Sequence, residues 1–164
     1  MGFSLEHASF QANKIPIIGL LFLCISTFSA SSLELNDSLI SFIQKRFGTE
    51  AVQRLHQWEK IANLKKDLDE SDKLKLVNNF FNKAKFIPDS KHWGKEDYWA
   101  TPLELLATNG GDCEDYSIAK YFTLREMGVP IDKMKITYVK AVKLNQAHMV
   151  LAYYSSPGAE PLIL

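Results

Sequence analysis

An α+β fold is predicted, with a run of helices followed by a small antiparallel sheet. Between residues 38 and 127, apolar side chains recur every three or four positions, which is typical of amphipathic helices. From residue 135 onward the pattern changes to an alternation of apolar and polar residues, which is typical of strands. Because helices and strands are segregated along the chain, an α+β arrangement is favoured over alternating βα units.

Three amphipathic helices are expected first. Ser38 can cap the first helix and Gly48 can end it, after which Thr49 opens the second. The charged stretch at 65–72 is expected to be a solvated connection to the third helix, which ends before Pro88. The apolar positions expected to face the core are Leu39, Ile40, Phe42, Ile43 and Phe47, then Val52, Leu55, Trp58, Ile61 and Leu64, then Leu74, Val77, Phe80, Phe81 and Ala84.

Two helices are expected in the middle of the chain. Residues 87–99 have the composition of a loop, and Thr101 with Pro102 begins a short helix that ends at Asn109. A longer helix is expected over 113–127, with Asp112 as its N-cap. Its expected inward residues are Ile118, Ala119, Phe122 and Met127.

The strands come last. Alternation predicts strands over 135–142 and 147–154, with a turn at Asn145 and Gln146 between them. A third strand begins over 162–164, where the sequence ends. On the second strand His148 shares a face with Val150, because successive strand side chains point to opposite faces.

The composition is that of a globular protein that recognises its partners locally. Hydrophobic residues make up 46% of the 164 residues, and 19 basic residues balance 19 acidic ones. A chain of this size buries roughly two thirds of its extended surface in one domain, without disulfides. Zero net charge removes the usual support for binding nucleic acid or a membrane surface.

The first 31 residues are expected to be a secretory signal peptide. An apolar run over 15–25 follows Lys14 and is followed by small residues. The run is about a dozen residues long, whereas a bilayer span needs roughly twenty. The alternative is an N-terminal anchor, because Pro16 and Gly19 interrupt the run. A single exported domain is then expected over 32–164.

Export leaves one thiol in this domain. Cys24 would be removed with the leader, so Cys113 cannot form an internal disulfide. Cys113 begins the expected helix after two glycines, where unpaired amides and the helix dipole favour a thiolate. This position suits a nucleophile, although a free cysteine is also common as a small core residue.

Three carboxylates surround that thiol in the sequence, those of Asp112, Glu114 and Asp115. At about 6 Å and an effective dielectric of about 20, each would cost a thiolate roughly 2–3 kcal/mol. A bound cation would offset them, and an all-oxygen donor set favours Ca²⁺. The alternative is an acidic first helical turn that stabilises the helix dipole without a metal.

His148 is the candidate base, because a strand packed on the cysteine's helix can bring an imidazole to the helix N-terminus. The alternative is a core histidine among the apolar residues of its strand.

These residues resemble a known family, the bacterial transglutaminase-like cysteine proteinases. The resemblance covers the chain from about Trp93 to its end and rests on these residues: Tyr98, Trp99, Ala100, Thr101, Pro102, Leu103 and Glu104, then Gly110, Gly111, Asp112, Cys113, Glu114, Asp115 and Tyr116, then Lys120, Leu124 and Gly128, with His148 on a later strand.

The resemblance implies a papain-like core, with Cys113 as nucleophile and His148 as general base. It implies Ca²⁺ at the carboxylates that flank the cysteine, best matched by Asp112 and Glu114. It also implies calcium-dependent cleavage of a large surface adhesin near its N-terminus, at paired alanines, which releases cells from biofilm. A periplasmic location and an inner-membrane cyclic-di-GMP receptor as partner are implied as well. Trp99 could line the substrate groove, or it could be core.

The sequence departs from the family at its C-terminus. The family's third catalytic residue is an aspartate on the strand after the histidine strand, where this sequence has Leu162 to Leu164. Glu160 does not occupy that position. Losing an orienting acid costs about 10⁴-fold in rate in serine proteases, so the domain is expected to be C-terminally incomplete or impaired. Two other functions stay open: acyl transfer to an amine, and an inert module that binds calcium and a partner.

Overall fold

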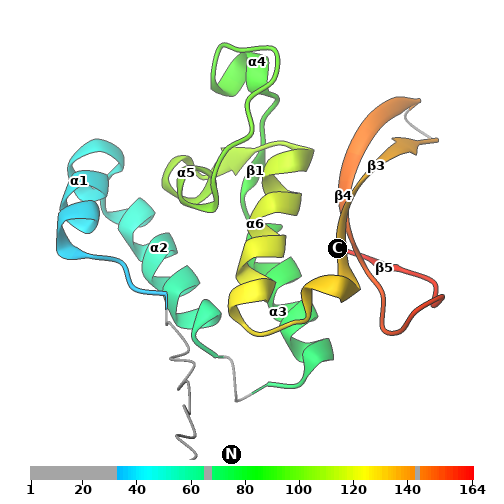
Figure 1. The fold of residues 1–164 in the computed structure, drawn as a ribbon. Coiled ribbons are helices and arrows are strands. Elements are labelled where there is room, and N and C mark those ends of the chain that lie inside the picture. The colour runs from blue at the N-terminus through cyan, green and yellow to red at the C-terminus, as the bar shows by residue number, and fades with distance from the viewer. Residues whose placement is uncertain (1–32, 65–67, 143–144) are drawn as a thin grey trace, which may run out of the picture. The chain divides into compact units, whose positions relative to one another are not determined.

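The computed structural model describes residues 33–64, 68–142 and 145–164 (Figure 1). The chain divides into two units, Met1–Ala30 and Ser31–Leu164, and every described element belongs to the second. The signal peptide or anchor expected over 1–31 lies outside the described residues and stays a prediction. Within the described ranges, no helix has both the length and the apolar character that crossing a bilayer requires.

The described elements confirm the α+β prediction, since the α-helices precede the antiparallel sheet. The helices are α1 (Asp37–Phe47), α2 (Thr49–Ala62), α3 (Glu70–Phe81), α4 (Asp89–His92), α5 (Pro102–Thr108) and α6 (Cys113–Glu126), and a 3₁₀ turn, η1, spans Ile131–Lys133. The strands are β1 (Lys85–Phe86), β2 (Gly110–Gly111), β3 (Met134–Ala141), β4 (Gln146–Tyr153) and β5 (Leu162–Ile163).

The described strands form two separate sheets. In the antiparallel sheet the order is β3-β4-β5, with Val139 opposite His148. The other set is a short parallel pair, in which Phe86 of β1 lies opposite Gly111 of β2. Because β2 directly precedes α6, this pair fixes the segment after α3 to the start of α6.

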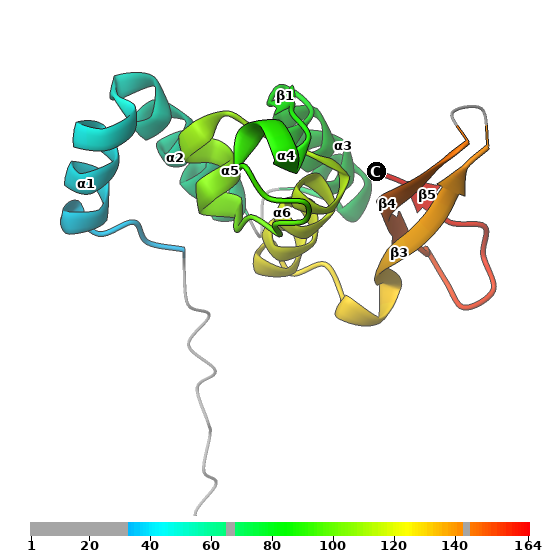
Figure 2. The same ribbon diagram turned by 90° about the horizontal axis from the view of Figure 1, so that it is seen from above.

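Helix α6 lies between the other helices and the sheet (Figures 1 and 2). It packs on β4 and β3 on one side and on α3, α5 and α2 on the other. The core continues across these contacts, from Leu55 and Trp58 in α2 to Leu124 in α6 and Leu151 in β4. This central position fixes the N-terminus of α6 relative to the sheet.

The structure corrects the predicted inward face of α6. Phe122, expected to point inward, is 39% exposed, and Ile118 is only half-buried, whereas Ala119 and Met127 are buried as expected. The buried positions of α6 are Asp115, Ser117, Ala119, Lys120, Thr123 and Leu124. Because this helix is covered from two sides, polar residues as well as apolar ones are buried, and hydrophobic periodicity fails to identify its core face.

Several helix ends agree with the sequence predictions and others do not. Gly48 ends α1, and Thr101 caps α5 in a capping box with Glu104. The N-cap of α1 is Asn36 instead of Ser38, because the Asn36 Oδ1 accepts a 2.8 Å hydrogen bond from the Leu39 amide.

Other local predictions are corrected in the same way. Helix α3 ends at Phe81, so Ala84 lies beyond it, and Gln146 belongs to β4 instead of the turn. Residues 87–99 contain the short helix α4. Phe42 is 58% exposed although it was expected in the core, because α1 contacts its neighbours with only part of its apolar stripe.

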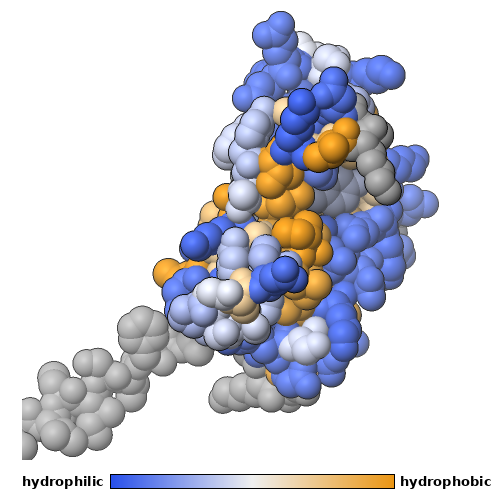
Figure 3. Space-filling view, turned by 90° about the vertical axis from the view of Figure 1, so that its right-hand side faces the viewer, coloured by the Kyte–Doolittle hydropathy of each residue, from blue (hydrophilic) through white to orange (hydrophobic). Residues whose placement is uncertain are grey.

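The sheet face of the molecule carries an apolar band (Figure 3). Large exposed hydrophobic residues of the antiparallel sheet and its strand ends include Ile136, Tyr138, Val142, Leu162 and Ile163. Among the described strands β3 pairs only with β4, so β3 is an edge strand. Exposed Lys135 and Lys140 lie along it, and charges of this kind discourage pairing with a second chain.

We expect Thr123→Val to destabilise the fold by about 1–3 kcal/mol, the cost of leaving a buried donor unsatisfied. The Trp58 indole donates a 2.7 Å hydrogen bond to the Thr123 Oγ1, which joins α2 to α6 in the core, and valine keeps the volume but removes the acceptor. Thermal unfolding measures the loss. Thr137→Val in β3 is the control, since its hydroxyl makes only a 3.4 Å contact with the Lys135 carbonyl. Equal effects of the two substitutions would contradict the prediction.

Candidate active site

Cys113 is the first residue of α6, as predicted, and Asp112 occupies the N-cap position. The two preceding glycines are required by close packing. A Cβ added at Gly111 would lie 2.8 Å from Leu105 Cδ1, and one at Gly110 would lie 2.6 Å from Ile87 Cδ1. These distances are shorter than van der Waals contact, so a side chain at either position would require its neighbours to shift. At Gly111 the neighbours include Asp115 Cβ at 2.9 Å, in a side chain that is fully buried.

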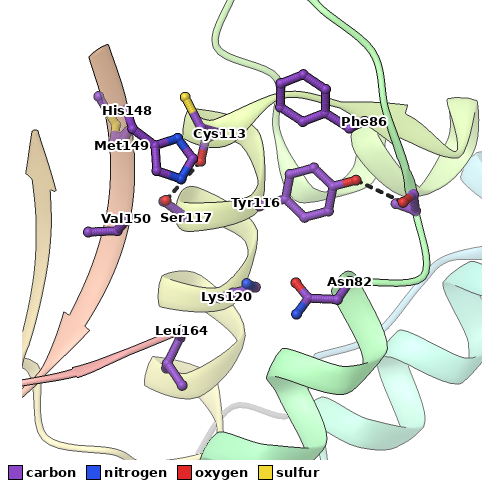
Figure 4. A pocket seen from close by; sticks show the side chains of 11 residues that line it. Asn82, Phe86, Cys113, Tyr116, Ser117, Lys120, His148, Met149, Val150 and Leu164 are labelled. Carbon is purple, nitrogen blue, oxygen red and sulfur yellow. Dashed lines mark hydrogen bonds between the residues drawn. The ribbon is translucent and has the colours of Figure 1, made fainter. Parts of the chain in front are cut away.

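The structure brings Cys113 and His148 to one cavity of about 300 Å³. Figure 4 shows the His148 ring extending from β4 toward the side of α6 that carries Cys113 and Ser117. The Ser117 Oγ donates a 2.8 Å hydrogen bond to the Cys113 carbonyl and so ties the first turn of α6 to the next. The juxtaposition of thiol and imidazole that the sequence predicted is therefore present.

The thiol itself is held in its protonated form by its surroundings. Burial, together with the Glu114 carboxylate that accepts a 3.0 Å hydrogen bond from the sulfur, raises the pKa of Cys113 to about 11. The charge of Asp112 adds to this effect, while the Met149 backbone amide opposes it. Without a compensating charge, very little of the thiol is thiolate at neutral pH.

The acidic cluster is larger than the sequence indicated. Asp89 from α4 and Asp97 from the following loop join Asp112, Glu114 and Asp115. Their oxygens form overlapping sets, each within 4.8 Å: Asp89, Asp112 and Asp115 in one, and Asp89, Asp97 and Glu114 in another. Asp89 and Asp97 could not be found from the sequence, because they lie 24 and 16 positions before Cys113 and no spacing motif connects them to it.

Two buried oxygens in this cluster have no hydrogen-bond partner, the Oδ1 atoms of Asp89 and Asp112. Asp89 is only 3% exposed. Buried polar atoms are almost always paired, so these oxygens point to a ligand. Burial and the adjoining Glu114 carboxylate raise the pKa of Asp112 to about 7, as expected where carboxylates crowd together without a cation.

Asp115 has a different environment. It is fully buried, and its carboxylate accepts hydrogen bonds from the Ala100 amide at 2.7 Å and the Asp112 amide at 3.2 Å. Burial and the charges of Asp89 and Glu114 nevertheless raise its pKa to about 6. The Asp115 carboxylate thus joins two backbone segments. If it also binds a metal, the same oxygens both coordinate the ion and accept these hydrogen bonds.

The donor chemistry of the cluster fits a hard cation. The oxygens come from carboxylates, and two of them are unpaired. The segment that carries Asp97 and Trp99 is joined to the first turn of α6 by the hydrogen bond from the Ala100 amide to Asp115. Carboxylate-rich sites of this kind suit Ca²⁺, while the nearby sulfur does not suit it as a ligand. Asp89, Asp97, Asp112 and Glu114 are the residues best placed to hold the ion.

Trp99 lies beside this cluster and is not among the residues that line the cavity. It is 54% exposed, and its indole donates a 3.1 Å hydrogen bond to Asp97 Oδ1. The alternative that Trp99 is core does not hold. A role in binding substrate stays a prediction.

His148 has no orienting acid in the described residues. Across 33–64, 68–142 and 145–164, no carboxylate accepts a hydrogen bond from its ring. β5 follows β4 as predicted, with Ile163 opposite Ala152, and Glu160 is exposed before it.

The acidic cluster makes stability dependent on pH when no cation is bound. Asp112 and Asp115 have pKa values of about 7 and about 6 in the folded chain, above the ordinary 3.8. The folded state therefore binds their protons more tightly than the unfolded state, and this stabilisation is lost as the pH rises from about 4 to about 7.

We therefore expect the melting temperature of EGTA-treated protein to fall between pH 5 and pH 7.5. Excess Ca²⁺ should raise it at pH 7.5 and have little effect at pH 5, because protons and the cation compete for the same carboxylates. Asp112→Asn should flatten the EGTA curve. A melting temperature that rises with pH in EGTA would contradict this assignment.

Comparisons with known proteins agree with this geometry. Residues 41–160 match the family model described as bacterial transglutaminase-like cysteine proteinase. Among solved structures, Legionella pneumophila LapG is 41% identical to this chain with a TM-score of 0.66, covering 76% of this chain and 71% of that one. Its calcium-bound form is 40% identical with a TM-score of 0.65, covering 76% and 70%. Its EGTA-treated form is 41% identical with a TM-score of 0.65, covering 76% and 69%. A comparison with curated proteins gave no match.

Proposed function

Since this chain belongs to the bacterial transglutaminase-like cysteine proteinases, we propose that it is a calcium-dependent cysteine endopeptidase. The observation that carries the proposal is the single cavity shared by Cys113, at the start of α6, and His148, on β4. Two elements far apart in sequence meet there with a nucleophile and a base. The adjoining acidic cluster with unpaired oxygens supports the dependence on calcium.

In this mechanism the Cys113 sulfur attacks the carbonyl carbon of the scissile peptide bond. His148 takes the thiol proton and then gives it to the leaving amine. Water hydrolyses the resulting thioester and regenerates the thiol. The oxyanion is stabilised by unpaired amides at the start of α6, where the dipole of this 14-residue helix is positive.

The carboxylates of Asp89, Asp97, Asp112 and Glu114 hold the cation in this proposal, and Asp115 holds Asp112 and Ala100 in place for it. When bound, Ca²⁺ supplies positive charge beside the sulfur and so favours the thiolate. The match to a calcium-bound structure of Legionella pneumophila LapG supports the choice of ion.

The proposed substrate is a large surface adhesin, cleaved near its N-terminus at paired alanines to release cells from biofilm. The proposed location is the periplasm, reached through the signal peptide expected over 1–31. An inner-membrane cyclic-di-GMP receptor is the proposed regulatory partner, and it would sequester the protease when that nucleotide is abundant. These proposals derive from the family resemblance.

A second candidate function is an inert module of the same fold that binds calcium and a partner. The observation that favours it is the His148 ring, which lacks a carboxylate partner within the described ranges. In a third candidate function, the Cys113 thiol would transfer an acyl group to an amine.

One experiment separates these functions. The full chain is incubated with a peptide that contains a central Ala-Ala, together with a primary amine, in excess Ca²⁺ or in EGTA, and the products are identified by mass spectrometry. Two hydrolysed fragments that form only with Ca²⁺ support the endopeptidase. An amine adduct would indicate acyl transfer, and an intact peptide beside measurable calcium binding would indicate the inert module.

A further inference from the structure

Lys120 is a buried cation without an acidic partner. Its residue is 4% exposed, and within the described ranges its only directed contact is with the Tyr116 ring, whose centroid lies 5.8 Å from Nζ. Burial lowers the pKa of Lys120 to about 8, so the amine is mostly protonated at neutral pH. Buried charges are normally paired, because desolvation is costly. The Lys120 Nζ is not among the fully buried side-chain atoms that lack a partner, so the ammonium group is reached from the cavity that Lys120 lines, where an anion could pair with it.

The cavity that Lys120 faces is the one that holds Cys113 and His148. Figure 4 shows the Lys120 side chain on α6 below Tyr116, pointing toward Asn82 at the end of α3. Among the described residues that line this cavity, none is Asp or Glu. The Tyr116 hydroxyl is already committed, since it donates a 2.8 Å hydrogen bond to the Ala84 carbonyl.

The walls around Lys120 are largely apolar. Phe86 and Tyr116 contribute aromatic rings, and Val150 contributes an aliphatic side chain. One ammonium group at the base of apolar walls suits a carboxylate on a short methylene stem, because the stem packs on the walls while the carboxylate pairs with the amine. Phosphate groups are usually bound by several donors, whereas Lys120 is the one Lys or Arg among the described residues that line this cavity.

We propose that Lys120 is a specificity-determining residue, which binds the side-chain carboxylate of a glutamate or aspartate in the substrate. This inference rests on the proposed endopeptidase function. Lys120 lies seven positions after Cys113 on α6, which corresponds to about 10 Å along the helix axis. An extended peptide rises about 3.3 Å per residue, so the acidic residue lies about three positions from the scissile bond.

The test measures binding of fluorescent peptides to calcium-loaded Cys113→Ala protein by anisotropy. Each peptide has a central Ala-Ala, and Glu, Gln or Lys occupies one of the four positions on either side. We expect Glu to bind about tenfold more tightly than Gln at one position, the size of effect typical of a hydrogen bond to a charged group. In Lys120→Met protein this preference disappears, and in Lys120→Glu protein the Lys peptide is preferred. Lys120→Arg keeps the preference for Glu.

Arg125→Met is the matched control, since it removes an exposed cation from the same helix outside the cavity and leaves the preference for Glu intact. Equal binding of Glu and Gln peptides at every position would overturn the proposal, and so would a preference that survives in folded Lys120→Met protein. The Glu and Gln comparison uses the unaltered Lys120, so a variant that fails to fold does not remove the test. Binding is measured without turnover, so a failure of the unmodified chain to cleave any peptide would refute the endopeptidase and leave this readout intact.

Discussion

Cys113→Ala is expected to lower cleavage of an Ala-Ala peptide by roughly 10⁴- to 10⁶-fold, the range found when a catalytic nucleophile is removed from a protease. The reason is geometric, because Cys113 is the thiol that shares a cavity with the His148 ring. The measurement is the initial rate at saturating Ca²⁺, with thermal unfolding as the check that the variant is folded.

Ser117→Ala is the control for this substitution. Ser117 lies one turn further along α6 and donates to the Cys113 carbonyl, so its loss affects the same turn of helix without removing the nucleophile. We expect the Ser117 variant to keep most of its activity. Comparable rates for Cys113→Ala and the unmodified chain would show that the reaction takes place elsewhere.

Removal of calcium is expected to have the second largest effect. Each unit of pKa changes the thiolate fraction tenfold. If the cation returns the pKa of Cys113 from about 11 to its ordinary 9.0, iodoacetamide should label the thiol about 100-fold faster with Ca²⁺ than with EGTA. Cleavage should fall by a similar factor in EGTA. Labelling at one rate in both conditions would contradict the electrostatic role of the ion.

Calcium affinity tests the role of Asp89, one of the two acidic residues that the sequence analysis did not identify. Asp89→Asn removes a charge from a buried side chain with an unpaired oxygen. We expect it to weaken calcium binding about tenfold or more, since even groups that only support metal ligands are worth 10- to 100-fold. Asp132→Asn, on exposed η1, is the control with no expected effect on calcium affinity.

Local signals in the sequence predicted much of the fold correctly. Gly48, Thr101 and Asp112 each act on neighbouring backbone groups, so the helix boundaries near them could be predicted from the residues alone. The meeting of Cys113 with His148 was also predictable, because it follows from packing one strand on one helix. Asn36 was missed because the Ser38 that competes with it is an equally good cap by residue type.

The remaining features depend on tertiary contacts. Asp89 and Asp97 reach the acidic cluster only through the path of the loop after β1, which has no sequence signature. Lys120 and Thr123 are buried because α6 is covered on two sides, and neither was among the inward residues expected from hydrophobic periodicity. Phe122 shows the converse, since an aromatic residue lies at the surface.

The β1–β2 pair gives the acidic cluster a rigid geometry before any ligand arrives. The Ile87 amide donates a 2.9 Å hydrogen bond to the Gly111 carbonyl. Ile87 lies two residues before Asp89, and Gly111 lies one residue before Asp112. Asp89 and Asp112, which are 23 positions apart in the sequence, are thus held close together in the folded chain. Folding has already closed the loop between them, so ion binding carries no further entropic cost of loop closure. Lengthening the chain between Phe86 and Asp89 by one residue should therefore weaken calcium binding while α6 keeps its thiol in place.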